Sequence, residues 1–220
     1  MKKKTQHLPE EKKPAPENYL QKIINASVQK PEEFYAKNSD EKGFKPTIIH
    51  YLLCILAATP IALLVNYQAI ASGVGGTTLL PGYAIFAGAL VATALNVVLG
   101  LAGACVYVGL FHAVSYALGA REGILRTAQS YAYGMTASLI ISPYISGVSS
   151  YFELVSVQTA LGFMLFLAGL AVLIWGFYRV YHGVVGLQKL SFWKAIIATI
   201  LPVVILFALY ALLMGLAPVA

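Results

Sequence analysis

Long apolar runs alternate with short polar stretches over most of this chain. Charged residues are scarce from Thr47 to the C-terminus, whereas the first 45 residues hold ten of the fifteen basic and seven of the nine acidic residues. Because an unpaired charge inside a bilayer costs several kcal/mol, the polar stretches are expected at membrane surfaces. Apolar runs of about twenty residues match a hydrocarbon core of about 30 Å. The pattern therefore predicts an all-α, polytopic membrane protein.

Five membrane spans are predicted from the apolar runs. The second run is about 36 residues long, or roughly 54 Å as a helix, and predicts one long tilted helix. A break near Gly100 and Gly103 is the alternative. Pro60 in the first span and Pro202 in the fifth predict kinks, which neighbouring helices can tolerate. The predicted spans cover residues 47–66, 83–118, 124–142, 159–180 and 192–214.

The positions of lysine and arginine predict how the spans are oriented. All fifteen lie in the N-terminal region, in the polar island 119–126 or in the segment 179–194, and the predicted loops 67–82 and 144–158 contain none. Cytoplasmic loops are enriched in these two residues. We therefore expect a cytoplasmic N-terminus, a C-terminus on the opposite side and, for a prokaryotic source, a location in the cell membrane.

The polar N-terminal region divides into two parts ahead of a membrane body at 46–220. Residues 1–17 are mainly lysine, glutamate and proline, with little to bury, and are expected to be disordered. Residues 18–45 hold apolar side chains at helical spacing and a second helix start at Pro31. This predicts amphipathic juxtamembrane helices that lie on lipid headgroups. A docking site for a cytosolic protein partner is the alternative.

Small residues recur at every fourth position along the second span. At this spacing they let two helix backbones approach closely, and an asparagine in the row can form a hydrogen bond across the contact. We interpret the row as a packing seam, either within the bundle or between two copies in a homo-oligomer. Its members are Gly88, Ala92, Asn96, Gly100 and Ala104.

Few side chains in the spans could carry chemistry. His50 and His112 are interpreted as interfacial or packing residues, and Cys54 and Cys105 as small buried apolar residues. Paired carboxylates, metal-ligand spacings and a phosphate-binding glycine motif are all missing from the sequence. A basic stripe with interleaved aromatic residues, which would favour nucleic acid, is also missing. We therefore expect no enzyme activity, no catalytic residue, no cofactor and no bound metal.

Basic residues at the expected cytoplasmic surface are candidates for lipid contact. Anionic headgroups in the cytoplasmic leaflet attract lysine and arginine. Signalling of membrane topology alone is the simpler interpretation of the same residues. The candidates are Arg121, Arg126, Arg179 and Lys189.

Several short motifs occur in a characteristic order. They are KPEEFYAKN before the first span, HAVSYALGAREG at the end of the second, AQSYAYGMTASLI in the third, and an aromatic end of the fourth span followed by a polar turn. The positions that carry the pattern are Phe34, Tyr131, Tyr133, Gly134, Pro143 and Lys194. In these features the chain resembles the Yip family of Ypt/Rab-interacting membrane proteins, over about residues 30 to 215.

The resemblance implies five spans, a cytoplasmic N-terminus and no known catalytic activity. Eukaryotic relatives look like organisers of vesicle trafficking that bind Rab-type GTPases. They carry an Asp-Leu-Tyr-Gly-Pro segment before the first span, and its absence here puts GTPase binding in doubt. The short tail and compact loops look more like those of a bacterial or archaeal member.

The leading hypothesis for function is a non-enzymatic scaffold or membrane-organising protein, in contact with lipid, with a cytosolic partner or with a second copy. The alternative is a small-molecule transporter or channel. It rests on Pro60, Pro202 and the glycine-rich stretch 99–103, which are typical of broken helices around a midplane site.

Overall fold

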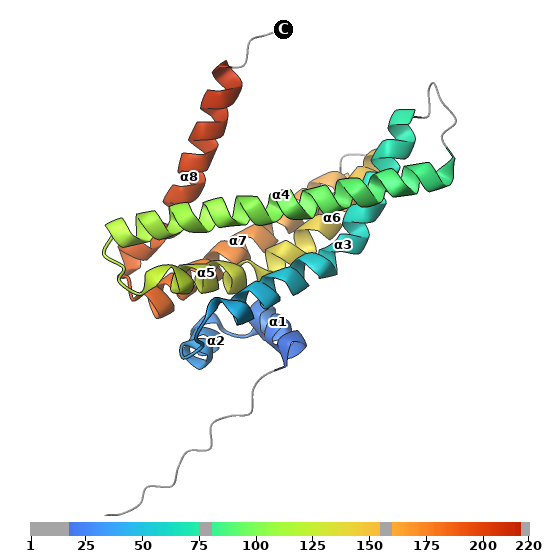
Figure 1. Ribbon diagram of the computed structural model, residues 1–220. Helices are drawn as coiled ribbons and strands as arrows, with labels where there is room; N and C mark the ends of the chain where they lie inside the picture. Colours follow the sequence, from blue (N-terminus) through green and yellow to red (C-terminus); the bar gives the residue numbers. More distant parts are fainter. Residues whose placement is uncertain (1–17, 75–80, 155–159, 217–220) are drawn as a thin grey trace, which may run out of the picture.

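The computed structural model describes residues 18–74, 81–154 and 160–216 (Figure 1). Within these ranges the chain forms eight helices joined by short connections. The helices are α1 (Tyr19–Val28), α2 (Pro31–Asn38), α3 (Phe44–Val74), α4 (Gly82–Ala117), α5 (Gly123–Gly134), α6 (Thr136–Leu154), α7 (Ala160–Gln188) and α8 (Phe192–Leu216). The predicted tail, residues 1–17, lies outside the described residues.

Four of the described helices are long and apolar enough to cross a membrane. They cover Phe44–Gly73, Gly82–Ala117, Leu161–Gln188 and Phe192–Leu212. The count of five spans is not confirmed, because the run predicted as the third span is divided between α5 and α6. The backbone between them turns at Met135, where ψ is 4°. The next residue, Thr136, donates its hydroxyl to the carbonyls of Ala132 and Tyr133, a bond that competes with regular helix geometry.

The boundaries of two helices differ from those that the sequence predicts. The sequence predicts a loop over residues 144–158, but α6 continues through Pro143 as far as Leu154. It also predicts a loop from residue 67, whereas α3 extends to Val74. Residues 75–80 and 155–159 lie outside the described part of the chain. Apolar and small uncharged residues continue past the predicted ends, so composition alone does not mark where these helices stop.

Helix α4 is one continuous helix of 36 residues. It passes Gly100 and Gly103 without a break, so the alternative of a broken second span is wrong. A Cβ added at either glycine would meet no atom within 4 Å. These glycines therefore face open surface, and their lack of a side chain is not required by any contact inside the monomer.

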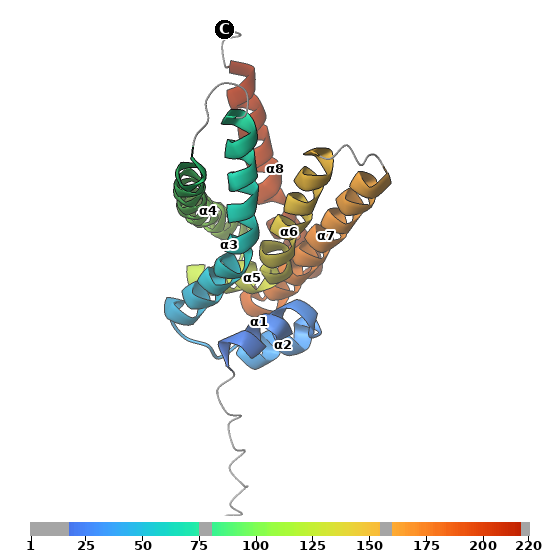
Figure 2. The same ribbon diagram turned by 90° about the vertical axis from the view of Figure 1, so that its right-hand side faces the viewer.

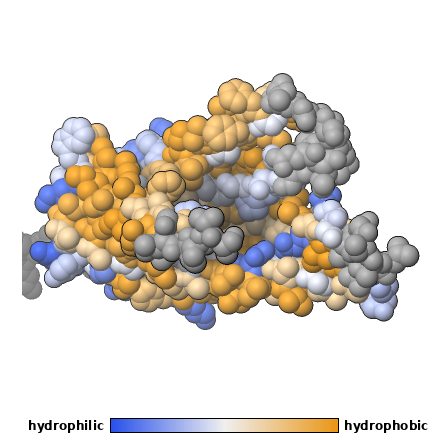
Figure 3. Space-filling view, turned by 90° about the horizontal axis from the view of Figure 1, so that it is seen from above, coloured by the Kyte–Doolittle hydropathy of each residue, from blue (hydrophilic) through white to orange (hydrophobic). Residues whose placement is uncertain are grey.

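The long helices pack side by side, and the two N-terminal helices lie against one face of them. Figures 1 and 2 show α1 and α2 below α5 and α7, while most of α8 projects away from the bundle. The opposite face is largely covered by apolar residues, as Figure 3 shows. Among the exposed apolar side chains on the long helices are Leu56, Leu95, Phe163 and Phe207. Such a surface is stable only when lipid covers it.

The tightest contact inside the bundle joins α7 to α5 and α6 through glycines. A Cβ on Gly176 would lie 2.5 Å from the Ser138 Oγ, and a Cβ on Gly183 would lie 3.0 Å from the Ser130 Cα. Gly134 of α5 approaches the backbone of Val180 equally closely. Small residues therefore allow α7 to pack closely on α5 and α6.

The row that the sequence predicts as a seam on α4 has a different environment. Asn96 and Gly100 are exposed, while Gly88, Ala92 and Ala104 are half-buried. The face of α4 that packs on α3 includes the neighbouring Thr93, which accepts a hydrogen bond from the Asn66 side-chain nitrogen at 2.9 Å. Packing of this row against a second copy stays a prediction.

Candidate functional site

Helix α1 packs on the bundle through a face that carries a lysine. The Asn18 side chain accepts a hydrogen bond from the Leu20 backbone N–H at 3.3 Å and starts the helix. Lys22 and Ala26, one turn apart, are the buried residues of α1. The apolar residues that define its amphipathic pattern face outward instead: Leu20, Ile24 and Val28 are 65%, 52% and 71% exposed. A lysine thus occupies the face that docks on the protein.

The buried lysine joins three segments of the chain. Its Nζ lies 2.6 Å from the Glu41 Oε2 in the connection between α2 and α3, and 3.0 Å from the Tyr133 hydroxyl of α5. The Tyr133 hydroxyl in turn donates to the same carboxylate. The Lys22 and Glu41 side chains are only 6% and 18% exposed, and Tyr133 is fully buried. Because each polar group forms a hydrogen bond with another member, this Lys22–Glu41–Tyr133 cluster fixes α1 against α5.

Arg179 of α7 holds the C-terminal end of α1. The side chain is completely buried, and its guanidinium donates to the carbonyls of Gln29 and Asn25. It also lies over the Phe34 ring, at 5.6 Å from the centroid. A cation at this position binds carbonyls at the end of α1 and complements the negative end of the helix dipole. The sequence places Arg179 among headgroup contacts; in the structure it is an internal anchor.

An aromatic core lies beneath α2. Phe34 and Tyr35 are buried, and the Phe34 ring meets the Tyr133 ring edge-on at 5.6 Å. The Tyr35 hydroxyl donates to the Ser130 carbonyl at 3.2 Å. Burial raises the pKa of Tyr35 above its ordinary value, so the hydroxyl stays protonated and able to donate. The Tyr35 ring reaches this position because Gly183 leaves room for it.

Replacing Tyr35 with phenylalanine tests this hydrogen bond. The change removes one donor and leaves the Ser130 carbonyl without its tyrosine partner, which costs about 1–2 kcal/mol of unfolding free energy. Thermal unfolding in detergent should show a lower midpoint than wild type. A Tyr19→Phe variant at a half-exposed hydroxyl of α1 is the matched control, and an equal midpoint in both variants would contradict the assigned role.

His50 of α3 lies beside this core. Its Nε2 is 2.9 Å from the Thr136 Oγ1, and its ring meets Tyr133 edge-on at 4.8 Å. Because the Thr136 hydroxyl donates to backbone carbonyls, it accepts from His50, so Nε2 carries the proton. His50 is completely buried. It is thus a packing residue. His112 Nδ1 similarly lies 3.0 Å from the Thr127 Oγ1.

The remaining candidates for headgroup contact are held by the protein in different ways. Arg126 Nη1 donates to the Glu41 carbonyl at 3.2 Å and to the Gln129 Oε1 at 2.8 Å. Arg121 is exposed. Lys189 lies 2.7 Å from Glu122, and its hydrogen bond and charge lower the pKa of that carboxyl.

The two cysteines differ in exposure. Cys54 is buried, as the sequence predicts, whereas Cys105 is exposed on α4, and both thiols are free. The prediction that Cys105 is buried is therefore wrong. The apolar surroundings of Cys105 in the sequence do not distinguish a protein core from a lipid-facing surface.

Comparison with known proteins identifies the family. Residues 26–213 match the Yip1 domain, and this match covers most of the chain. The chain belongs to the Yip family. It is an integral multi-pass membrane protein, and the Yip family is not known as a family of enzymes. No curated protein and no solved structure matches the chain.

Two of the six positions predicted to carry the family pattern meet in the aromatic core beneath α2, and a third lies at the contact of α5 with α7. Phe34 and Tyr133 form the aromatic core, and Gly134 allows the close approach of α5 to α7. Tyr131 instead packs against Tyr107 of α4, with ring centroids 4.9 Å apart. Pro143 lies inside α6, and Lys194 is exposed at the start of α8. Two of the predicted pattern positions, Phe34 and Tyr133, therefore lie where the N-terminal helices contact the bundle.

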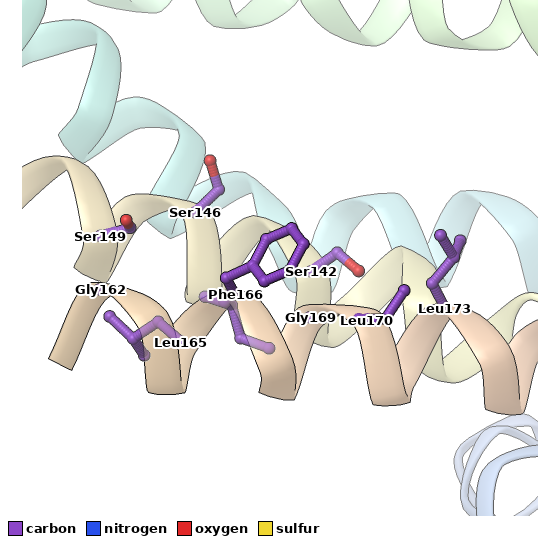
Figure 4. Close-up of a pocket in the computed structure, with 10 residues that line it drawn as sticks. Ser142, Ser146, Ser149, Gly162, Leu165, Phe166, Gly169, Leu170 and Leu173 are labelled. Atoms are coloured by element: carbon purple, nitrogen blue, oxygen red, sulfur yellow. The ribbon is translucent and has the colours of Figure 1, made fainter. Parts of the chain in front are cut away.

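A groove between α6 and α7 is a separate feature of the Yip bundle. It has a volume of about 500 Å³ and is lined by Ser142, Ser146 and Ser149 on α6, opposite Gly162 and Gly169 on α7. Figure 4 shows these hydroxyls and the ring of Phe166 along the groove. Outside this groove, the Ser138 Oγ of α6 donates a hydrogen bond to the Val172 carbonyl of α7 at 3.0 Å, and none of the described residues that line the groove is titratable. Its chemistry is that of a weakly polar packing surface.

Proposed function

We propose that this Yip-family protein is a non-enzymatic membrane scaffold, whose N-terminal helices form a rigid platform on the cytoplasmic side. The observation that carries the proposal is the docking of α1 by the Lys22–Glu41–Tyr133 cluster and Arg179. A helix held only by lipid would not need buried ionic contacts to the bundle. Docking instead fixes the direction in which the other face of α1 points.

The outward face of α1 is the surface that such a platform would offer. Leu20, Ile24 and Val28 form one row at steps of four residues and are all exposed. An apolar helix face of this kind binds a groove on a partner or inserts into the headgroup region. Because the cluster holds α1 rigid, binding through this face loses little conformational freedom. The platform is therefore suited to a cytosolic protein partner or to the leaflet surface.

The double substitution Leu20→Ser and Ile24→Ser tests the platform. Both side chains are exposed, so we expect the unfolding free energy to change by no more than about 0.5 kcal/mol per site. Crosslinking and pull-down from native membranes should lose the proteins that wild type captures. This design is sharper than deletion of residues 1–45, which would also expose Arg179 and Tyr133 and damage the bundle.

The matched control is the pair Glu33→Ser and Lys37→Ser on the exposed surface of α2. It removes two exposed side chains without touching the row on α1. Equal capture by the control and wild type, with loss in the α1 variant, supports the scaffold. If the α1 variant captures the same proteins as wild type, the platform proposal fails.

Assembly through α4 is the second part of the proposal. Asn96 and Gly100 are exposed on this helix, as a contact with a second copy requires. We expect Gly100→Leu to reduce the oligomer size in detergent. Gly109→Leu is the matched control, because Gly109 also faces open space but lies on the opposite side of α4. An unchanged oligomer size for Gly100→Leu would argue against the seam.

Transport is the alternative function, and one observation favours it. The break between α5 and α6 places the polar pair of His50 and Thr136 inside the bundle, as at the broken helices of transporters. However, the three features that suggested broken helices all lie inside continuous helices: Pro60 in α3, residues 99–103 in α4 and Pro202 in α8. If the protein carries a solute into liposomes and His50→Ala abolishes this flux, the protein is a transporter and the scaffold proposal fails.

A further inference from the structure

A second groove lies between α3, α4 and α5, on a different side of the bundle from the α6–α7 groove. Its volume is about 500 Å³, within the range of sites that bind small molecules. The wall is built mainly from apolar side chains, including Ile48 and Leu52 of α3, Leu101 and Val108 of α4 and Ile124 of α5. Both α3 and α4 are long enough to span a membrane. The groove therefore faces acyl chains.

One end of the groove lies where two helices begin. Phe44 is the first residue of α3, and Ile124 lies in the first turn of α5. The connection before α3 and the start of α5 are held together, because Arg126 and Gln129 both donate to the Glu41 carbonyl. The groove therefore ends at a surface of fixed shape, where the chain becomes polar.

This polar end carries an excess of positive charge. The residues next to the groove wall in sequence are Lys42, Lys45, Arg121 and Arg126. The nearby carboxylates of Glu41 and Glu122 are already paired, with Lys22 and Lys189 respectively. Asp40 is the remaining acidic residue in these two segments. The two segments that flank this end therefore hold more basic than acidic residues.

We propose that this groove binds one acyl chain of an anionic glycerophospholipid, with the lipid phosphate at the basic end. The apolar wall removes the chain from water, and lysine and arginine attract the phosphate. The charge distinguishes a lipid from the apolar helix of a second copy, which would gain nothing from the basic end. The inference needs only a membrane-embedded Yip bundle and does not rest on the platform formed by α1.

The test is lipid binding to the purified full-length protein, measured by native mass spectrometry. Dioleoyl phosphatidylglycerol and dioleoyl phosphatidylcholine are titrated separately, because they share acyl chains and differ in charge. We expect phosphatidylglycerol to bind roughly tenfold more tightly, since each nearby basic residue contributes a several-fold gain. Equal affinity for the two lipids in the wild-type protein would overturn the proposal.

Two variants separate the groove from its basic end. Ala104→Trp places an indole in the groove and should abolish binding of both lipids, whereas Ala102→Trp, which faces outward two residues away, should leave both unchanged. Lys45→Gln with Arg121→Gln should remove the preference for phosphatidylglycerol and keep phosphatidylcholine binding. Lys30→Gln, at an exposed lysine of the α1–α2 connection, is the charge control.

The groove variant and the charge variant each have a result that would contradict the proposal. Wild-type affinity in Ala104→Trp would mean that lipid binds elsewhere, and a preserved preference in the glutamine pair would mean that the basic end does not select. Thermal unfolding of each variant checks that it is folded. If Ala104→Trp does not fold, the glutamine pair decides the proposal, because both of its side chains are exposed and tolerate substitution.

Discussion

Replacing Gly134 with alanine is expected to force α5 away from α7 and to cost about 3 kcal/mol of unfolding free energy. The added Cβ would lie 2.5 Å from the Val180 Cγ2, 2.7 Å from its backbone nitrogen and 2.8 Å from its Cα. Two of these three atoms are backbone, so a rotamer change cannot relieve the clash. Thermal or denaturant unfolding of the purified protein in detergent measures the loss.

Gly100→Ala is the control for this substitution. A Cβ at Gly100 would meet no atom within 4 Å, and alanine is favoured over glycine inside a helix by about 0.5–1 kcal/mol. We therefore expect Gly100→Ala to be neutral or slightly stabilising. The close contact between α5 and α7 would be contradicted if the two variants unfolded at the same temperature.

Replacing Lys22 with methionine is expected to release the N-terminal helices from the bundle. Methionine is one heavy atom shorter than lysine and apolar, so it leaves the carboxylate of Glu41 without its cation in a largely buried position. Breaking a buried ion pair by removing one partner typically costs about 3–5 kcal/mol. Because the pair joins separate segments, this cost falls on docking. Hydrogen exchange should show that amides of α1 and α2 exchange faster than in wild type, with those of α7 unchanged.

Two further variants make the result specific. Lys30→Met removes a lysine that is 80% exposed and should leave exchange unchanged. Lys22→Met combined with Glu41→Met removes both charges and should restore part of the protection, because no uncompensated carboxylate remains, while the buried Tyr133 hydroxyl loses both of its partners in this cluster. If Lys22→Met alone exchanges as slowly as wild type, the ion pair does not hold the helices.

The apolar runs were enough to predict long helices, and α4 in particular follows from its 36 residues alone. The division of the third predicted span into α5 and α6 could not be read in the same way. Gln129, Ser130 and Thr127 are completely buried in α5. The Gln129 and Thr127 side chains hydrogen-bond to Glu41 and Gln188, and the Ser130 hydroxyl donates to the Arg126 carbonyl of its own helix. A hydropathy scale counts such residues as polar, because it takes no account of their hydrogen-bond partners.

The docking site depended on contacts that are remote in sequence. Glu41 and Tyr133 are 92 residues apart, and Lys22 and Tyr133 are 111 apart. The periodicity of α1 predicted an apolar face on lipid headgroups, but it gave no sign that Lys22 would be buried against a carboxylate and a hydroxyl of the protein. A pattern on one helix cannot report the chemistry of its partner.

One local signal for the packing of α7 was present in the sequence. Glycine occurs at positions 162, 169, 176 and 183, at a spacing of seven residues. Such a row lies along one side of a helix and permits close approach to a neighbour. Gly176 and Gly183 make that approach, to Ser138 and Ser130 respectively. A search for glycine at heptad spacing would have found this contact. The row on α4, with small residues at every fourth position, drew the prediction to a different helix.

The most direct test of the docked N-terminal helices is an engineered disulfide between α2 and α7. A Cβ at Gly186 would lie 3.6 Å from the Tyr35 Cβ, within the range that a disulfide spans. The pair Tyr35→Cys and Gly186→Cys is introduced after Cys54→Ala and Cys105→Ala have removed the native thiols. Ala36→Cys with Gly186→Cys is the control, because Ala36 is exposed on the next position of α2.

The readout is protection of both thiols from a maleimide after mild oxidation in native membranes, and its reversal by a reductant. Docking predicts complete protection for the pair at 35 and 186 and little for the control pair. If the pair at 35 and 186 stays as reactive as the control, α2 does not rest on α7, and the account of a docked N-terminal platform is wrong.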